Sequence, residues 1–214
     1  MPISVILVDD HEVVRDGLRH LIEAQPDLRF LAGFSDGQEA VRFAASAHPD
    51  VAVVDVAMPN MNGIEVTRQI HDACPATEVL ILSMHAEPEY IYKAFRAGAR
   101  GYVIKESAGG EVVGALRTLR SGRRYLSRKL DRYAIERYIG ERGEDNPLER
   151  LSARERQVLQ LIVEGKTSAE VAARLGLSPK SVDTYRSRMM KKLEIEDLAA
   201  LVKFAIRHGI TSLE

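Results

Sequence analysis

The chain has 214 residues, of which 45% are hydrophobic and 29% are charged, and its formal net charge is −1. These values are typical of a globular protein and exclude fibrous and intrinsically disordered chains. The single cysteine, Cys74, excludes a disulfide scaffold and a zinc ribbon, and no window approaches the roughly 18 apolar residues of a membrane span. We therefore expect a cytoplasmic protein with no membrane partner.

Charge is distributed unevenly along the chain. Residues 1–116 contain 9 lysines and arginines against 17 aspartates and glutamates, which gives a net charge of −8. Residues 117–147 and 148–214 have net charges of +4 and +3. This asymmetry favours a cation-dependent or protein-binding module joined to a module that binds a polyanion, although uneven surface charge alone also explains it.

The first 120 residues alternate apolar runs with amphipathic segments. The expected strands are 3–8, 28–34, 51–54, 79–82 and 101–104. The expected helices are 12–24, 37–47, 63–73, 88–97 and 110–121. Continuous apolar runs are typical of strands buried on both faces of a parallel sheet. Five βα units in succession predict a doubly wound α/β domain over 1–121, with a five-stranded parallel sheet and a functional site at the carboxyl ends of its strands.

The next segment, 122–147, is polar and basic and contains the breakers Gly143, Asn146 and Pro147. We expect it to extend the last helix of the α/β domain and then to form a linker.

No strand pattern follows Pro147. Ser152 precedes Glu155 by three residues, which is the spacing of a capping box at the start of a helix. Further helical patterns follow at 168–175, at 180–193 and from Asp197 onward. Four short helices predict a small all-α domain over 148–214, and the short turn LGLSPK between the second and third predicts a helix-turn-helix.

Three carboxylates follow expected strands of the first domain. Asp9 and Asp10 come directly after the first strand, and Asp55 ends the third. In a parallel sheet all three emerge at one edge, where they repel one another unless a cation is present, and Mg²⁺ is the hard cation that such a site favours. Capping of the helix at 12–24 explains Asp9 or Asp10 alone, but it explains neither the pair nor Asp55.

Two more polar residues end expected strands. Ser83 ends the fourth strand, and Lys105 follows the fifth. Each alone could be a solvated loop residue. Together they place a hydroxyl donor and an ammonium group at the same edge as the carboxylates.

The segments VILVDDH, VVDVAMPNMNG, ILSMH and GARGYVIK resemble the receiver domain of bacterial two-component response regulators, over essentially all of residues 1–121. This resemblance implies a flavodoxin-like fold in which Asp55 is the phospho-acceptor. It also implies that Asp10, Asp55 and the main-chain carbonyl of Ala57 bind Mg²⁺, and that Asp9 orients a metal-bound water.

The same resemblance assigns roles at the neighbouring strands. Lys105 would neutralise charge on the transferred phosphoryl group, and Ser83 would donate to its oxygens. Tyr102 matches the aromatic switch position, which moves inward when Ser83 is engaged. Phosphorylation of Asp55 would then repack the surface formed by the fourth helix, fifth strand and fifth helix.

The helix at 180–193 has two different faces. Val182, Tyr185, Met189 and Leu193 recur at helical spacing and should face inward. The opposite face, with basic and short polar side chains, suits a DNA major groove, although a merely solvated face is the alternative. It consists of Lys180, Asp183, Thr184, Ser187, Arg188 and Lys191.

The segment LSARERQVLQLIVEGKTSAEVAARLGLSPKSVDTYRSRMMKKLEI resembles the LuxR-type helix-turn-helix, over residues 148–209. With the receiver, the whole chain resembles the NarL/FixJ family of response regulators. One departure is Asp183, where that family often has a basic residue. This aspartate would either favour a cytosine amino group or repel other sites.

This resemblance implies a transcription regulator that is not an enzyme. A histidine kinase would phosphorylate Asp55, and the helix-turn-helix would bind double-stranded promoter DNA as a homodimer. One alternative is a phosphorylation-independent DNA binder whose receiver is a protein-interaction module; loss of Asp9, Asp10 or Lys105 would indicate it, and all three are present. Another is a Mg²⁺-dependent phosphohydrolase, which usually needs an acid where this chain has Ala57.

Overall fold

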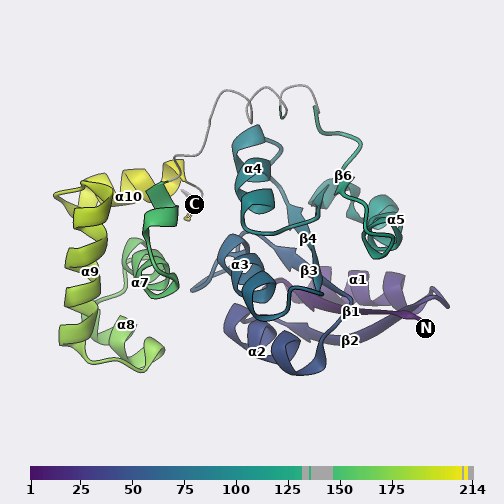
Figure 1. Cartoon of the computed structure of the whole chain (residues 1–214), viewed down its shortest axis with the longest axis horizontal. Helices are drawn as coiled ribbons and strands as arrows, with labels where there is room; N and C mark the ends of the chain where they lie inside the picture. Colours follow the sequence, from purple (N-terminus) through teal and green to yellow (C-terminus); the bar gives the residue numbers. More distant parts are fainter. Residues whose placement is uncertain (132–134, 136–146, 209, 212–214) are drawn as a thin grey trace. The chain divides into compact units, whose positions relative to one another are not determined.

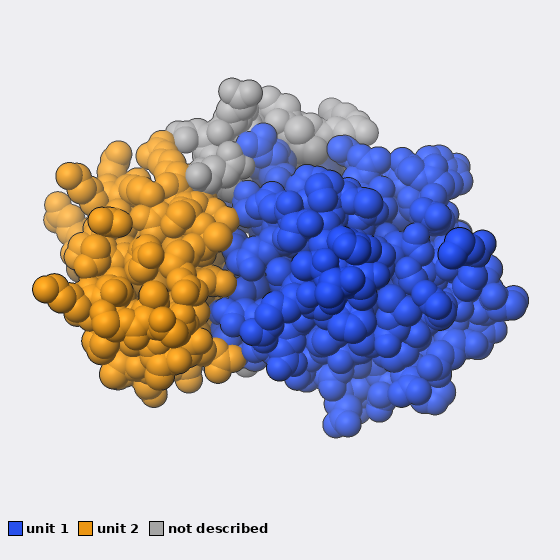
Figure 2. All heavy atoms as spheres, turned by 60° about the horizontal axis from the view of Figure 1, so that its bottom comes forward, with its two compact units in different colours: residues 1–142 blue, residues 143–214 orange. Residues whose placement is uncertain are grey.

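The computed structural model describes residues 1–131, 135, 147–208 and 210–211. The chain forms two compact units, Met1–Arg142 and Gly143–Glu214, which are coloured separately in Figure 2. Most of the segment expected as a linker, 132–134 and 136–146, lies outside the described residues, as do the last three residues of the expected all-α domain. Among the described helices, none is long and apolar enough to cross a membrane.

The first unit is built on a parallel sheet of six strands in the order β2-β1-β3-β4-β5-β6. The strands are β1 (Ile3–Val8), β2 (Leu28–Phe34), β3 (Val51–Asp55), β4 (Glu78–Ser83), β5 (Gly101–Ile104) and β6 (Tyr125–Leu126). The doubly wound α/β fold is therefore confirmed, with one strand more than the predicted five. Because β3 lies between β1 and β4, its end occupies the middle of the sheet's carboxyl edge.

Helices cover both faces of this sheet (Figure 1). They are α1 (Glu12–Glu23), α2 (Gly37–Ala47), α3 (Gly63–Ala73), α4 (Pro88–Arg96) and α5 (Ala108–Arg120), with a 3₁₀ turn η1 (Lys105–Ser107) before α5. Residues of α2, α3 and α4 share one hydrophobic core, and residues of α1 and α5 share the other. Burial on both faces is the reason that the strands read as continuous apolar runs.

The sixth strand corrects the expectation that a helix continues past residue 121. Helix α5 ends at Arg120, and Gly122 adopts a left-handed conformation with φ of 76°. The chain then turns back, so that the Tyr125 N–H donates to the Arg100 carbonyl at 3.1 Å. A strand of two residues is too short to show an alternating or continuous apolar pattern.

The second unit contains four α-helices in its described part, as predicted. They are α7 (Ala153–Val163), α8 (Ser168–Leu175), α9 (Pro179–Leu193) and α10 (Leu198–Arg207), after a 3₁₀ turn η2 (Pro147–Arg150). The capping box of Ser152 and Glu155 is present at the start of α7. Gly176, with φ of 63°, ends α8 and lets the chain turn into α9. Helices α7, α8, α9 and α10 pack around one hydrophobic core.

Candidate phospho-acceptor site and DNA-binding helix

Polar side chains from four neighbouring strands meet at the carboxyl edge of the sheet. Asp9 follows β1, Asp55 is the last residue of β3, and Ser83 is the last residue of β4. Their exposed fractions are 2%, 1% and 1%. Lys105 follows β5, and its side chain is 15% exposed. Because the strands are parallel and adjacent, the fold itself brings these groups together.

Lys105 bridges two of the carboxylates. Its Nζ lies 2.8 Å from Asp55 Oδ2 and 2.9 Å from Asp9 Oδ2. Burial alone would lower the pKa of the Lys105 ammonium, but the hydrogen bond and charge of Asp55, with those of Asp9, raise this pKa above its ordinary value. The ammonium therefore stays protonated and partly balances two buried negative charges.

The carboxyl group of Asp55 has a raised pKa. Burial raises its pKa to about 6, against the lowering effect of the Lys105 hydrogen bond, and the nearby Asp9 charge adds to the rise. The backbone N–H of Ala57 also donates to this carboxyl group and lowers its pKa. At neutral pH, Asp55 is thus ionised but poorly solvated, which favours its use as a nucleophile or a cation ligand.

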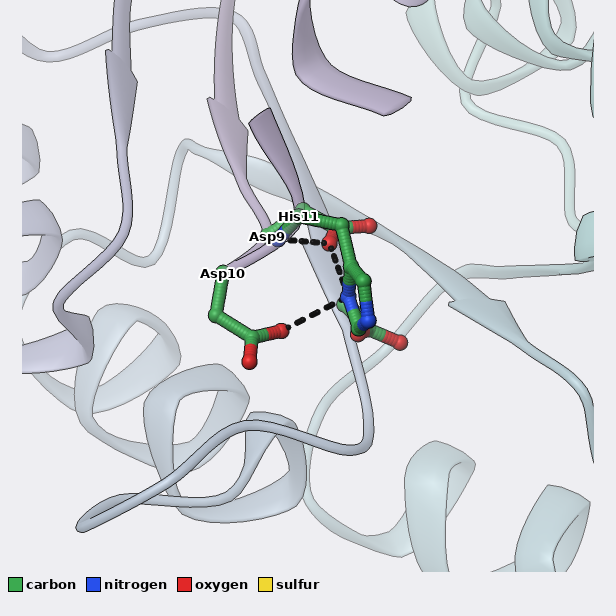
Figure 3. Close-up of side chains that lie close together, drawn as sticks. Asp9, Asp10 and His11 are labelled. Atoms are coloured by element: carbon green, nitrogen blue, oxygen red, sulfur yellow. Dashed lines mark hydrogen bonds and ion pairs between the residues drawn. The ribbon is translucent and has the colours of Figure 1, made fainter. Parts of the chain in front are cut away.

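Asp9, Asp10 and His11 lie close together at the start of the β1–α1 loop (Figure 3). Asp9 Oδ1 accepts a hydrogen bond from the His11 backbone N–H at 2.9 Å. The His11 Nδ1 lies 3.2 Å from Asp9 Oδ1 and 3.0 Å from Asp10 Oδ1. The N-cap of α1 is His11 itself, without a side-chain cap, so neither aspartate is held there as a helix cap.

This cluster has the donor set of a hard-cation site. One ligand atom from each of Asp9, Asp10, His11 and Asp55 lies within 4.8 Å of the others. Asp10 Oδ1 is buried and accepts no hydrogen bond of regular geometry from the described residues, although His11 is near. Carboxylate oxygens at this spacing fit Mg²⁺. Ala57, whose carbonyl was expected to join them, is exposed in the loop after β3.

Ser83 and Tyr102 both contact the loop between β4 and α4. Ser83 Oγ accepts from the His85 backbone N–H at 3.0 Å, and the Tyr102 hydroxyl donates to the His85 carbonyl at 2.8 Å. Tyr102 is completely buried, and burial raises the pKa of its phenol, which stays neutral. The His85 ring stacks on Tyr90 with centroids 4.0 Å apart. Sequence reasoning did not pair His85 with Ser83 or Tyr102, because both of these contacts are made by the His85 backbone.

The loop after Asp55 depends on a glycine. The Gly63 N–H donates to the Val56 carbonyl at 2.9 Å, which closes the loop onto the end of β3. A Cβ atom at Gly63 would lie 1.9 Å from the Asp55 carbonyl oxygen. Only glycine allows this approach of α3 to the strand that bears Asp55.

In the second unit, α9 has the two faces that its sequence predicts. Val182 and Met189 are fully buried, and Tyr185 and Leu193 are partly buried against the same core. The side chains on the other face are all exposed. They are Lys180, Asp183, Thr184, Ser187, Arg188 and Lys191.

Two members of this exposed face make contacts that sequence reasoning missed. Ser168 Oγ, at the start of α8, donates to Asp183 Oδ1 at 2.8 Å. The Thr184 hydroxyl donates to the Lys180 carbonyl at 2.9 Å. A third missed contact fixes α9 on α7, since Lys192 Nζ lies 2.6 Å from the buried Glu155 Oε2.

Comparisons with known proteins match both units. The response regulator receiver domain matches residues 5–117, and the luxR family of bacterial regulatory proteins matches residues 149–205. The response regulator UvrY of Escherichia coli strain K12 is 36% identical over 212 residues, which cover 99% of this chain and 97% of UvrY. The transcriptional regulatory protein LiaR of Bacillus subtilis is 35% identical over 211 residues, which cover 98% of this chain and 100% of LiaR.

Two solved structures extend these matches. A two-component response regulator of the LuxR family from Aurantimonas is 38% identical, with a TM-score of 0.61, over 65% of this chain and 99% of that one. The response regulator ChrA of a heme-sensing two-component system is 31% identical, with a TM-score of 0.53, over 98% of both chains. The likeness therefore spans both units.

Proposed function

This chain belongs to the NarL/FixJ family of two-component response regulators, with a receiver domain and a LuxR-type DNA-binding domain, and on that premise we propose that Asp55 is the residue that a partner histidine kinase phosphorylates. The observation that carries the proposal is the burial of Asp55 between Asp9 and Lys105, at the centre of the sheet's carboxyl edge. Burial of this carboxyl group raises its pKa to about 6.

In the proposed reaction, a carboxylate oxygen of Asp55 forms a bond to phosphorus while the phosphorus–nitrogen bond of a phosphohistidine breaks. The departing histidine keeps the electron pair and takes up a proton from water. Lys105, already paired with Asp55, stays close enough to neutralise charge on the transferred group. The product is an acyl phosphate on Asp55.

We assign the divalent-cation site to Asp10, Asp55 and the carbonyl of Ala57, with Asp9 orienting a metal-bound water. Mg²⁺ at such a site supplies positive charge that offsets the charge of the phosphoryl oxygens. The close spacing of the Asp9, Asp10 and Asp55 oxygens supports this assignment. The same carboxylates would otherwise repel one another.

The proposed output passes through Ser83 and Tyr102. The Ser83 hydroxyl, which now accepts from the His85 N–H, would turn its own proton toward the new phosphoryl oxygens. Tyr102 is held by the same loop through the His85 carbonyl, so a shift of this loop reaches α4 and β5. In the second unit, α9 would enter the major groove of promoter DNA, with Lys180, Arg188 and Lys191 on phosphates. On activation, two copies of the chain would pair as a homodimer on the DNA.

The direct test is Asp55→Asn, with Asp72→Asn at the exposed end of α3 as the matched control. The full chain is incubated with acetyl phosphate and Mg²⁺, and the phosphorylated fraction is read by intact-mass spectrometry. We expect an added phosphoryl group in wild type and Asp72→Asn and none in Asp55→Asn. Incorporation in Asp55→Asn would contradict the assignment of the acceptor.

A second measurement distinguishes the proposed function from the alternative in which DNA binding does not depend on phosphorylation. DNA affinity is compared for wild type and Asp55→Asn, each with and without acetyl phosphate. We expect acetyl phosphate to tighten binding of wild type alone. Equal affinities in all four samples would favour the alternative in which the receiver acts only as a protein-interaction module.

A further inference from the structure

The start of α8 is hydrogen-bonded to the exposed face of α9 at one point. Ser168 is the first residue of α8, and its Oγ donates to Asp183 Oδ1 at 2.8 Å. The two residues are 15 positions apart in the chain, so the contact exists only because the turn at Gly176 brings the two helices together. Thr167 and Glu170 cap α8, and the capped first turn fixes the backbone position of Ser168.

Asp183 differs chemically from its neighbours on α9. Lys180 and Lys191 are cations, and the proton of the Thr184 hydroxyl is already given to the Lys180 carbonyl. An ionised carboxylate can only accept hydrogen bonds. Among the contacts within the described residues, Ser168 is the only hydrogen-bond donor to Asp183, and it uses Oδ1. The second oxygen, Oδ2, belongs to an exposed side chain and accepts no hydrogen bond from the described residues.

The major groove offers few donors to such an oxygen. Guanine presents two acceptors there, and thymine presents an acceptor and a methyl group, so both repel a carboxylate. In an A·T pair the adenine amino group lies between two acceptors, adenine N7 and thymine O4, whereas in a C·G pair the cytosine amino group has an acceptor, guanine O6, on one side only. A carboxylate that is held in one orientation therefore fits cytosine best.

We propose that Ser168 and Asp183 form a base-reading pair, in which Ser168 orients the carboxylate and Asp183 Oδ2 accepts a hydrogen bond from the amino group of one cytosine in the DNA site. Asp183 is then the specificity-determining residue, and Ser168 is its positioning residue. This inference rests on the proposed insertion of α9 into the major groove. It assigns a base type to one position of the site without assigning the remaining positions.

The test selects binding sites for the acetyl phosphate-treated full chain from a randomised pool of duplex DNA. Affinity is then measured for the selected duplex and for its single-base-pair variants. We expect one position to require cytosine, with the other bases weakening binding between about fivefold and a hundredfold, the range for one good base contact. In Asp183→Ala this preference should vanish. Asp183→Asn keeps the shape of the side chain and serves as the second variant, and it should lose most of the preference because its amide also donates.

Ser168 is tested by removal and rescue. Ser168→Ala should reduce the cytosine preference severalfold while affinity for non-specific duplex and its salt dependence stay unchanged. Ser168→Thr keeps the hydroxyl and should restore the preference. A merely structural role of Ser168 would instead change affinity for all sequences together.

The outcomes separate this inference from the function on which it rests. If wild type binds no duplex DNA, the proposed function and this inference both fail. If wild type selects a motif that Asp183→Ala reads identically at every position, or if the base pair whose preference is lost in Asp183→Ala is A·T and not C·G, only the base-reading pair is overturned. If Ser168→Ala keeps the full preference, the positioning role of Ser168 is overturned.

Discussion

The two units place their proposed functional groups in opposite environments. In the first unit, Asp9, Asp55 and Ser83 are at most 2% exposed. In the second unit, the polar side chains of α9 that are proposed to meet DNA are all exposed. Buried charges must be balanced within the protein, as Lys105 balances Asp9 and Asp55, whereas exposed charges are balanced by water and salt until a partner arrives.

The two environments determine how sensitive each unit is to substitution. Small steric changes near the buried site should have large effects, because close-packed interiors do not absorb extra volume. Single changes on the exposed helix should have small effects on folding and modest effects on binding.

The largest effect is expected for Gly63→Ala, beside Asp55. The added Cβ would lie 1.9 Å from the Asp55 carbonyl oxygen, which is backbone and cannot move away as a side chain could. We expect the free energy of unfolding of the first unit to fall by at least about 3 kcal/mol. Urea denaturation followed by circular dichroism measures the change.

The matched control is Gly114→Ala on α5, where an added Cβ meets no heavy atom within 4 Å. Because alanine favours a helix interior over glycine, this variant should be more stable by about 0.5–1 kcal/mol. A similar loss in both variants would mean that close packing at Gly63 is not the cause.

The next largest effect is expected at one of the two capping boxes of the second unit. Glu155 is 3% exposed, caps α7 and pairs with Lys192 of α9, whereas Glu170 caps α8 in an exposed position. We expect Glu155→Ala to reduce the free energy of unfolding by about 2 kcal/mol, because a cap and a partly buried ion pair are lost together. Glu170→Ala should cost less, since water replaces its contacts.

Hydrogen–deuterium exchange of the full chain locates these losses. Glu155→Ala should speed exchange in peptides of both α7 and α9, and Glu170→Ala should affect only the start of α8. Equal effects of the two variants would show that burial of Glu155 adds nothing to its capping role.

A third effect is the pH dependence of cation binding at the buried site. The pKa of Asp55 is raised to about 6, so this carboxyl group is ionised above pH 6 and protonated below it. A proton must then leave before Mg²⁺ binds, and affinity should be lower by about tenfold at pH 5 than at pH 7. Calorimetric titration with MgCl₂ measures the change. A flat affinity between these pH values would contradict a raised pKa of Asp55.

The smallest effect is expected for Lys191→Ala on α9. Loss of one phosphate contact should weaken binding to all DNA sequences alike and reduce the slope of log affinity against log salt by about 0.9. Lys129→Ala removes an exposed lysine of the first unit and is the control. A change confined to particular base sequences would instead place Lys191 at a base edge.

The sequence predicts most of the fold because its signals are local and strong. Continuous apolar runs identify the five longer strands, and the polar residues that end them predict one shared edge. The strand β6 (Tyr125–Leu126) was missed, because two residues following a basic, glycine-containing segment give no periodicity. It is held instead by pairing with β5, which is a tertiary interaction.

Contacts between helices of the second unit were also beyond sequence reasoning. Residues 155 and 192 are 37 positions apart, and their pairing depends on how α7 and α9 cross. Asp183 was correctly expected on the exposed face, but its bond to Ser168 requires the turn geometry at Gly176. Periodicity assigns a face to each helix without assigning the partner of each side chain.

The strand order also has a consequence for biosynthesis. Because β3 joins the free edge of β1, and β4, β5 and β6 each join the edge left by the preceding strand, a chain leaving the ribosome can add one βα unit at a time to a growing sheet. Asp9 and Asp55 are in place from β3 onward, but Lys105 arrives only after β5. Between the synthesis of β3 and that of Lys105, the nascent sheet therefore holds two carboxylates that no lysine yet balances, and a divalent cation from the cell would ease its assembly before any kinase is met.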